Sequence, residues 1–176
     1  MPYYILEARA YRSGIPLWAN MKVQTMSYFT KEEQQVVNQA IAIMDSKLKK
    51  EITSCNNVLS IKNFLRFQME QCQREHLGVL YLDNQLRLIE YRIVFSGAVN
   101  YCTMSPREIV KDALQLNATA IIMAHNHPSG ESEPSSADVA STVKTRETLK
   151  LFEIKLVDHF VVGKGQISSM VESGLI

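Results

Sequence analysis

Two histidines and one aspartate stand close together in the stretch HNHPSGESEPSSAD, which runs from residue 125 to residue 138. His125 and His127 are separated by a single residue, and Asp138 follows after a short turn-forming segment. Two imidazoles and one carboxylate are a set of protein ligands that catalytic zinc uses while a fourth position stays open for water. We interpret this stretch as the metal site of a hydrolase, with zinc as the cofactor.

The flanking residues are suited to hold these three side chains together. Residues 119–124 read TAIIMA, an apolar run typical of a buried strand, and alternate residues of a strand point to the same side. Both histidines, at the end of this strand, can therefore face one point. The chain then turns at residues 128–130 (PSG), and Ser135 or Ser136 can begin a helix whose first turn contains Asp138.

Each part of this pattern also has an ordinary structural explanation. An aspartate three residues after a serine cap is a common helix start and needs no metal. The two histidines could bond to the backbone of a polar turn. The literal string HNH is no evidence for the nuclease motif of that name, because the residues of that motif are widely spread in sequence. The combination of strand-end histidines, tight turn and helix-start aspartate favours the metal site.

A wider pattern resembles a known family. The spacing H-x-H-x7-S-x2-D, formed by His125, His127, Ser135 and Asp138, resembles the signature of the JAMM (MPN+, JAB-type) zinc metalloproteases. The resemblance to the RadC-like JAB branch of bacterial proteins covers about residues 58–176. It is carried by the stretches AHNHPSG, EPS and LVDHFVVG, and by LYLDNQ and SPREIVKDALQLNATAII further upstream.

This resemblance implies both a fold and an activity. The implied fold is an α/β fold of the JAB/MPN type, which is cytidine-deaminase-like, with a mixed β-sheet flanked by helices and with additional N-terminal helices. The implied activity is that of a zinc-dependent metallohydrolase, a metalloprotease that cleaves a peptide or isopeptide bond with metal-activated water. The substrate would be an unknown protein or peptide.

The resemblance also implies a general base. The family places a catalytic glutamate at the start of an early strand, and Glu75, directly before the apolar run HLGVL, occupies that position. From the sequence alone Glu75 would be an ordinary surface residue, and Glu70 and Glu90 are the other candidates. Ser135 resembles the serine whose hydroxyl helps to hold the oxyanion, a role that it could share with capping the helix.

Two further groups of residues contain side chains that can bind metals. Asp158 and His159 are adjacent in an expected strand, so their side chains face opposite sides, and one of them is expected to hydrogen-bond to the site or to a neighbouring loop. The three cysteines, Cys55, Cys72 and Cys102, have no metal-binding spacing and are expected to be reduced thiols.

The composition excludes several classes of protein. The 176 residues contain 19 basic and 18 acidic side chains, so charge gives no signature of nucleic-acid binding. No apolar run approaches the roughly 18 residues of a membrane span, and the expected location is cytoplasmic. The alternative function is that of a RadC-type accessory protein associated with DNA repair, without demonstrated catalysis. The absence of a recognisable helix-hairpin-helix segment weakens this alternative.

Periodicity and turn signals divide the chain into an N-terminal extension (1–29), a helical segment (30–72) and the metal-binding domain (73–176). Residues 30–33 (TKEE) form a predicted capping box, and Ser60 and Ser105 are predicted helix caps. Helices are expected at 31–50, 61–72, 106–116 and 136–151, and strands at 77–82, 86–95, 98–104, 119–124, 154–162 and 166–169.

Overall fold

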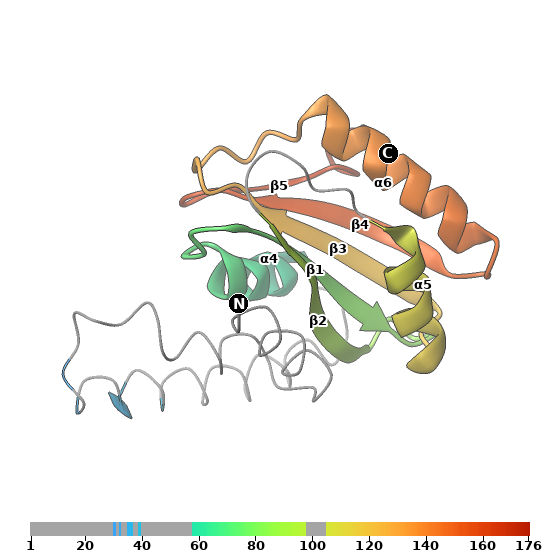
Figure 1. Ribbon diagram of the computed structural model, residues 1–176, viewed down its shortest axis with the longest axis horizontal. Helices are drawn as coiled ribbons and strands as arrows, with labels where there is room; N and C mark the ends of the chain where they lie inside the picture. Colours follow the sequence, from blue (N-terminus) through green and yellow to red (C-terminus); the bar gives the residue numbers. More distant parts are fainter. Residues whose placement is uncertain (1–29, 31, 33–34, 37–38, 40–57, 98–104) are drawn as a thin grey trace, which may run out of the picture. The chain divides into compact units, whose positions relative to one another are not determined.

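The computed structural model describes residues 30, 32, 35–36, 39, 58–97 and 105–176. Residues 32, 35–36 and 39 are helical. The elements that follow are α4 (Val58–Met69), β1 (Glu75–Leu82), β2 (Leu88–Gly97), α5 (Pro106–Gln115), β3 (Ala120–Asn126), α6 (Ser136–Lys150), β4 (Lys155–Val162) and β5 (Ile167–Ser169) (Figure 1).

The five strands form one mixed sheet in the order β2-β1-β3-β4-β5. β1 is antiparallel to both β2 and β3, β3 is parallel to β4, and β4 is antiparallel to β5. The parallel pair is connected through α6, as a parallel connection requires a crossover segment. The predicted α/β fold with a mixed sheet is therefore confirmed.

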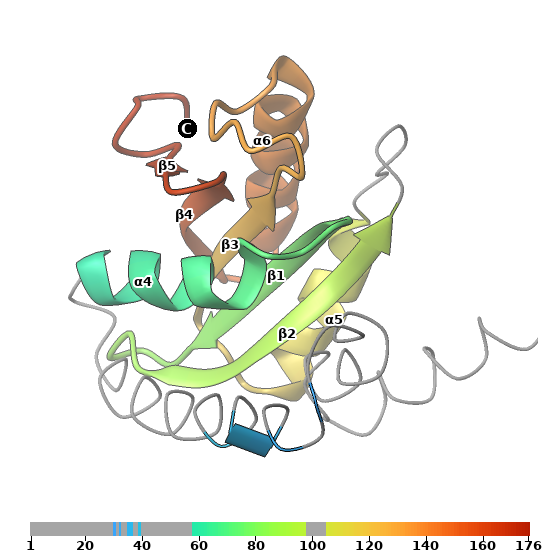
Figure 2. The ribbon, with the colours of Figure 1, turned by 90° about the vertical axis from the view of Figure 1, so that its left-hand side faces the viewer.

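β3 is the central strand, and all seven of its residues are buried. Helices lie on both faces of the sheet, with α4 on one side and α5 and α6 on the other (Figure 2). A strand that is covered on both faces is expected to be continuously apolar, as residues 120–124 are. The core between the sheet and the helices α5 and α6 contains Tyr81, Ile109, Met123 and Leu149.

Helices α5 and α6 begin at the predicted serines but are capped differently. Ser135 is the N-cap of α6, and its hydroxyl accepts a hydrogen bond from the backbone N–H of Asp138. Ser105 occupies the N-cap position of α5, followed by Pro106, but its side chain makes no capping hydrogen bond. The predicted capping role of the Ser105 hydroxyl is wrong.

Several predicted boundaries of the elements are also wrong. α4 begins at Val58 and ends at Met69, so Ser60 lies inside the helix and is not its cap. β2 continues through Ser96 and Gly97, which pair with β1 where a break was expected. β3 extends past residue 124 to Asn126, because β1 and β4 continue beside it. The predicted strand at 98–104 and the complete capping box at 30–33 lie outside the described residues.

The chain divides into two compact units, Met1–Leu48 and Lys49–Ile176. The second unit contains the whole sheet together with α4, α5 and α6. The proposed divisions of the chain at residues 29 and 72 stay predictions. Among the described residues, no helix has the length and apolar character needed to cross a membrane.

The packing of α6 provides a matched test of the core. Leu149 is fully buried against the sheet, whereas Leu151, two residues later, is 80% exposed. We expect Leu149→Ala to lower the free energy of unfolding by about 2–5 kcal/mol, because it leaves a cavity in the core. Leu151→Ala should change it by less than about 0.5 kcal/mol. Urea unfolding of both variants measures the difference, and equal losses would contradict this placement of α6.

Candidate metal centre

The end of β3 directs two imidazoles toward α6. Met123 belongs to the core formed with α5 and α6, and alternation along the strand places His125 and His127 on that same side. His125 is 4% exposed at the end of the strand. His127 lies one residue beyond β3, where its backbone N–H still donates to the carbonyl of Val162.

The first turn of α6 supplies the carboxylate. Ser135 and Asp138 form a capping box, in which the Ser135 N–H donates to Asp138 Oδ2 at 2.8 Å. The Ser135 hydroxyl donates to the same carboxylate oxygen at 2.6 Å. Two donors from one residue therefore fix the carboxylate in the orientation that faces the histidines.

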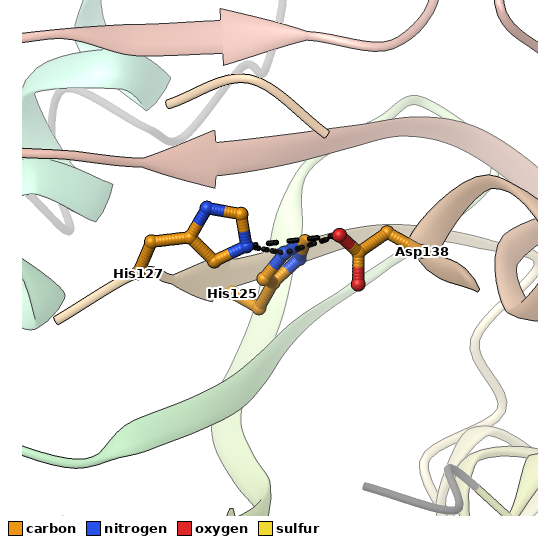
Figure 3. A group of neighbouring side chains, drawn as sticks. All are labelled: His125, His127 and Asp138. Atoms are coloured by element: carbon orange, nitrogen blue, oxygen red, sulfur yellow. Dashed lines mark hydrogen bonds and ion pairs between the residues drawn. The ribbon is translucent and has the colours of Figure 1, made fainter. Parts of the chain in front are cut away.

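The three side chains converge on one point (Figure 3). The Nε2 atoms of His125 and His127 are 3.0 Å apart, and Asp138 Oδ2 lies 3.6 Å from each of them. A tetrahedral zinc ion with bonds of about 2.0–2.1 Å separates its ligand atoms by roughly 3.4 Å. Both the geometry and the chemistry of the donor set therefore fit a zinc ion, and three protein donors are one fewer than its tetrahedral set of four.

The three groups also perturb one another electrostatically. The adjacent Asp138 carboxylate raises the pKa of His127 against the opposing effect of burial, and the Glu131 carbonyl and the Glu75 carboxylate act in the same direction. Burial alone would raise the pKa of Asp138, but interactions with both histidines and with Ser135 hold it far below its usual value. This arrangement favours a cation between the three groups.

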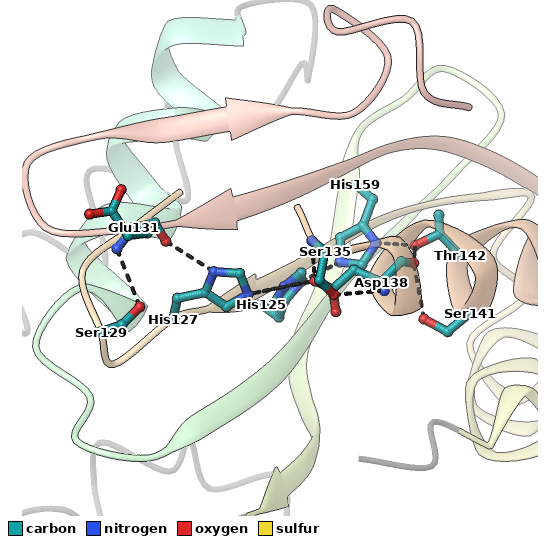
Figure 4. Close-up of polar contacts among 9 residues, drawn as sticks. All are labelled: His125, His127, Ser129, Glu131, Ser135, Asp138, Ser141, Thr142 and His159. Atoms are coloured by element: carbon teal, nitrogen blue, oxygen red, sulfur yellow. Dashed lines mark hydrogen bonds and ion pairs between the residues drawn. The ribbon is translucent and has the colours of Figure 1, made fainter. Parts of the chain in front are cut away.

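The second ring nitrogen of His125 and of His127 lies within hydrogen-bond distance of a neighbouring group (Figure 4). His127 Nδ1 lies 3.0 Å from the backbone carbonyl of Glu131. His125 Nδ1 lies 2.8 Å from Nε2 of His159, whose own Nδ1 lies 2.6 Å from the Thr142 hydroxyl. Complete burial, together with the nearby His125, holds the pKa of His159 well below its usual value.

Comparison with known proteins establishes the family. The family model of the RadC-like JAB domain matches residues 53–175. The chain belongs to the RadC family. It is 40% identical over 147 residues to the UPF0758 protein YkfG of Escherichia coli K12, covering 84% of this chain and 93% of that protein.

Two further relatives match as well. The chain is 47% identical over 116 residues to a UPF0758 protein of Marinomonas sp. strain MWYL1, covering 66% of this chain and 52% of that protein. It is 37% identical over 143 residues to YfjY of Escherichia coli K12, with 81% and 89% covered. This RadC-family chain thus spans nearly all of the two Escherichia coli proteins but about half of the Marinomonas relative.

Glu75, the residue predicted to be the base, lies at the first position of β1. Leu77 pairs with His125 in the antiparallel register, and Glu75 lies two residues before Leu77 in the same strand. Residues opposite each other on antiparallel strands present their side chains on the same face. Glu75 therefore begins its strand on the face that carries both histidines, and its charge contributes to the raised pKa of His127.

The other candidate bases are engaged elsewhere. The Glu70 carboxylate accepts hydrogen bonds from Arg66 and from the backbone N–H of Gly165. Glu90 forms an ion pair with Arg92 in β2 and lies opposite Tyr81, well along β1 from Glu75.

The Asp158–His159 pair and the cysteines are the remaining positions with an expectation from the sequence. Of the Asp158–His159 pair, His159 forms the expected hydrogen bond to the site, while Asp158 accepts from the Ser169 hydroxyl in β5 at 2.6 Å. Cys72 is a buried free thiol, whose pKa burial raises to about 11. Cys55 and Cys102 lie outside the described residues.

Sequence reasoning missed Asn126, which stands between the two histidines and faces the opposite side of the sheet. Its Oδ1 accepts from the backbone N–H of His76 at 2.8 Å. Its Nδ2 donates to the carbonyls of Cys72 and Arg74, at 3.4 and 3.0 Å. These three bonds hold the backbone on both sides of Glu75. The strand alternation of the HNH string indicates the direction of this side chain, but only the fold reveals its partners.

We expect Asn126→Ala to lower the free energy of unfolding by about 2–4 kcal/mol, because it leaves buried backbone groups without partners. The amide proton of His76 should also lose protection from hydrogen exchange. Asn84→Ala, in the exposed turn after β1, is the matched control and should change stability by less than about 0.5 kcal/mol. Unchanged exchange at His76 would show that Asn126 does not hold this segment.

Proposed function

We propose that this RadC-family protein is a zinc-dependent metallohydrolase that cleaves a peptide or isopeptide bond of a protein or peptide substrate. The observation that carries the proposal is the convergence of His125, His127 and Asp138, whose ligand atoms lie 3.0–3.6 Å apart. Two imidazoles and one carboxylate leave an open position on a tetrahedral ion, which is typical of catalytic and not of structural zinc.

A bound zinc ion would supply Lewis acidity, polarising a carbonyl and lowering the pKa of water. Amide hydrolysis further requires a group that accepts the proton of the attacking water and returns it to the leaving amine. Glu75 is our candidate, because it begins β1 on the face of His125 and His127 and is not one of the three potential ligands. Its carboxylate contributes to the raised pKa of His127, which supports this assignment.

Ser135 has two potential roles in this mechanism. Its hydroxyl proton is directed at Asp138 Oδ2, so that in this arrangement the serine orients the carboxylate. Stabilisation of an oxyanion would require the same hydroxyl to turn toward substrate while the Ser135 backbone N–H keeps its bond to Asp138. Both roles fit a residue at the N-terminus of α6.

Metal content is the most direct test of the site. The purified protein should contain about one zinc ion per chain, held by the three proposed ligands. The double variant His125→Ala, His127→Ala should contain almost none, as measured by elemental analysis after dialysis against metal-free buffer. If the double variant keeps its zinc, the metal is bound elsewhere in the chain.

Loss of the proposed base should affect the rate of hydrolysis, whereas loss of a proposed ligand should affect zinc binding. Glu75→Gln should retain zinc and thermal stability but lower hydrolysis by roughly two to four orders of magnitude, as expected for loss of a general base. Asp138→Asn should weaken zinc binding, because an amide is a poorer ligand than a carboxylate. Zinc occupancy and rate on a panel of peptide and isopeptide substrates are measured for both.

The combined results identify each role. Loss of zinc in Glu75→Gln would make Glu75 a ligand. Full activity with full occupancy would instead assign the proton transfer to another residue.

A further inference from the structure

His159 connects the candidate metal site to the buried side of α6. It does not itself face the metal position between the three proposed ligands. It lies in β4 and is completely buried. One ring nitrogen contacts His125 Nδ1 at 2.8 Å, and the other contacts the Thr142 hydroxyl at 2.6 Å. Thr142 lies one helical turn after Asp138, so the chain of contacts runs from one proposed ligand back to the helix that carries another (Figure 4).

The direction of these hydrogen bonds is determined at Thr142. Its hydroxyl oxygen lies 2.6 Å from the backbone carbonyl oxygen of Asp138. A carbonyl oxygen cannot donate, so the single hydroxyl proton of Thr142 must lie in this contact. Toward His159 the hydroxyl can then only accept, and Nδ1 of His159 must be the donor.

The same reasoning determines which nitrogens of His159 and His125 carry a proton. His159 is completely buried, and the contacts of its two nitrogens are to an imidazole and a hydroxyl and not to a carboxylate, which favours the neutral ring. A neutral imidazole has one donor and one acceptor nitrogen, so a proton on Nδ1 leaves Nε2 of His159 as an acceptor. His125 Nδ1 must then carry the proton in the 2.8 Å contact. The proton of His125 is thereby kept off Nε2, the nitrogen that faces His127 and Asp138.

We propose that Thr142 and His159 are positioning residues that hold His125 in its Nδ1–H tautomer and so keep its Nε2 lone pair directed at the metal position. This inference rests on the proposed zinc function, which it extends from the ligands to the groups that prepare them. A metal-bound histidine generally donates its other ring N–H to a partner that fixes ring and tautomer. Here the partner is a second, fully buried histidine.

The opposite direction of these hydrogen bonds would prevent His125 from binding the metal. If Thr142 donated to His159 Nδ1, then Nε2 of His159 would donate to His125 Nδ1 and the proton of His125 would lie on Nε2. That proton would occupy the position of the metal bond. The Asp138 carbonyl, as acceptor of the Thr142 proton, therefore selects the metal-competent direction.

His127 provides an internal reference, because its tautomer is fixed independently. Its Nδ1 faces the backbone carbonyl of Glu131, an acceptor that side-chain substitution at Thr142 does not remove. A change at Thr142 should therefore alter the tautomer of His125 and leave that of His127 unchanged. A general loosening of the site would alter both.

The experiment is nitrogen-15 NMR of histidine-labelled, metal-free protein, in which protonated and unprotonated ring nitrogens have well-separated shifts. In the wild type, His125 and His127 should both be protonated on Nδ1. Thr142→Val, of nearly the same shape but without a hydroxyl, should move His125 toward the Nε2–H form and weaken zinc binding by about 10–100-fold. Thr142→Ser keeps the hydroxyl and should behave as the wild type.

A second pair of variants covers the case in which Thr142→Val does not fold. In His159→Gln the side-chain amide can accept from His125 Nδ1 and donate to Thr142, so the tautomer and zinc affinity should be preserved. His159→Leu offers no acceptor and should lose both. An Nε2–H tautomer of His125 in the wild type overturns the proposal, as does a Thr142→Val or His159→Leu variant with unchanged tautomer and affinity.

The same measurements separate this proposal from the proposed function. A wild type that binds zinc while His125 is in the Nε2–H form would overturn the role of Thr142 and His159 and leave the zinc site standing. A wild type with the Nδ1–H form that binds no zinc would support the hydrogen-bond chain and overturn the zinc function.

Discussion

The crowding of three electron-rich atoms is the constraint on which the rest of the structure depends. Two imidazole nitrogens and a carboxylate oxygen lie 3.0–3.6 Å from one another at the edge of a buried core. Without a cation such atoms repel one another, and each must be held in place by other bonds. Ser135 holds the carboxylate, Glu131 holds one imidazole and His159 holds the other.

Side chains alternate between the two faces of the sheet along β3, so those at its end have two different roles. The histidines face α6 and form the site, while Asn126 between them faces α4 and binds the backbone around Glu75. One three-residue string therefore places two proposed ligands and fixes the segment that carries the proposed base. This explains why a polar residue is buried in the middle of the motif, where its hydrogen bonds offset the cost of desolvation.

Local patterns predicted the elements well where a single element determined them. The apolar run before His125 and the serine at the start of α6 both lie where expected. Element ends were predicted less well: β2 runs on through Ser96 and Gly97 because β1 offers them partners. Hydrogen bonding between strands decides where a strand ends, and a sequence does not display its partner strand.

The sequence by itself determined the family and the three residues proposed as metal ligands, because their types and spacing all lie within one stretch of chain. The sequence left open whether Asp158 or His159 reaches the site, and it indicated neither Thr142 nor the partners of Asn126, so tertiary structure decided these contacts. His159 comes from β4, Thr142 from the buried face of α6, and Asn126 finds its partners fifty or more residues earlier in the chain. Hydrogen bonds require atoms within about 3 Å, and only the folded sheet brings such distant residues to that distance.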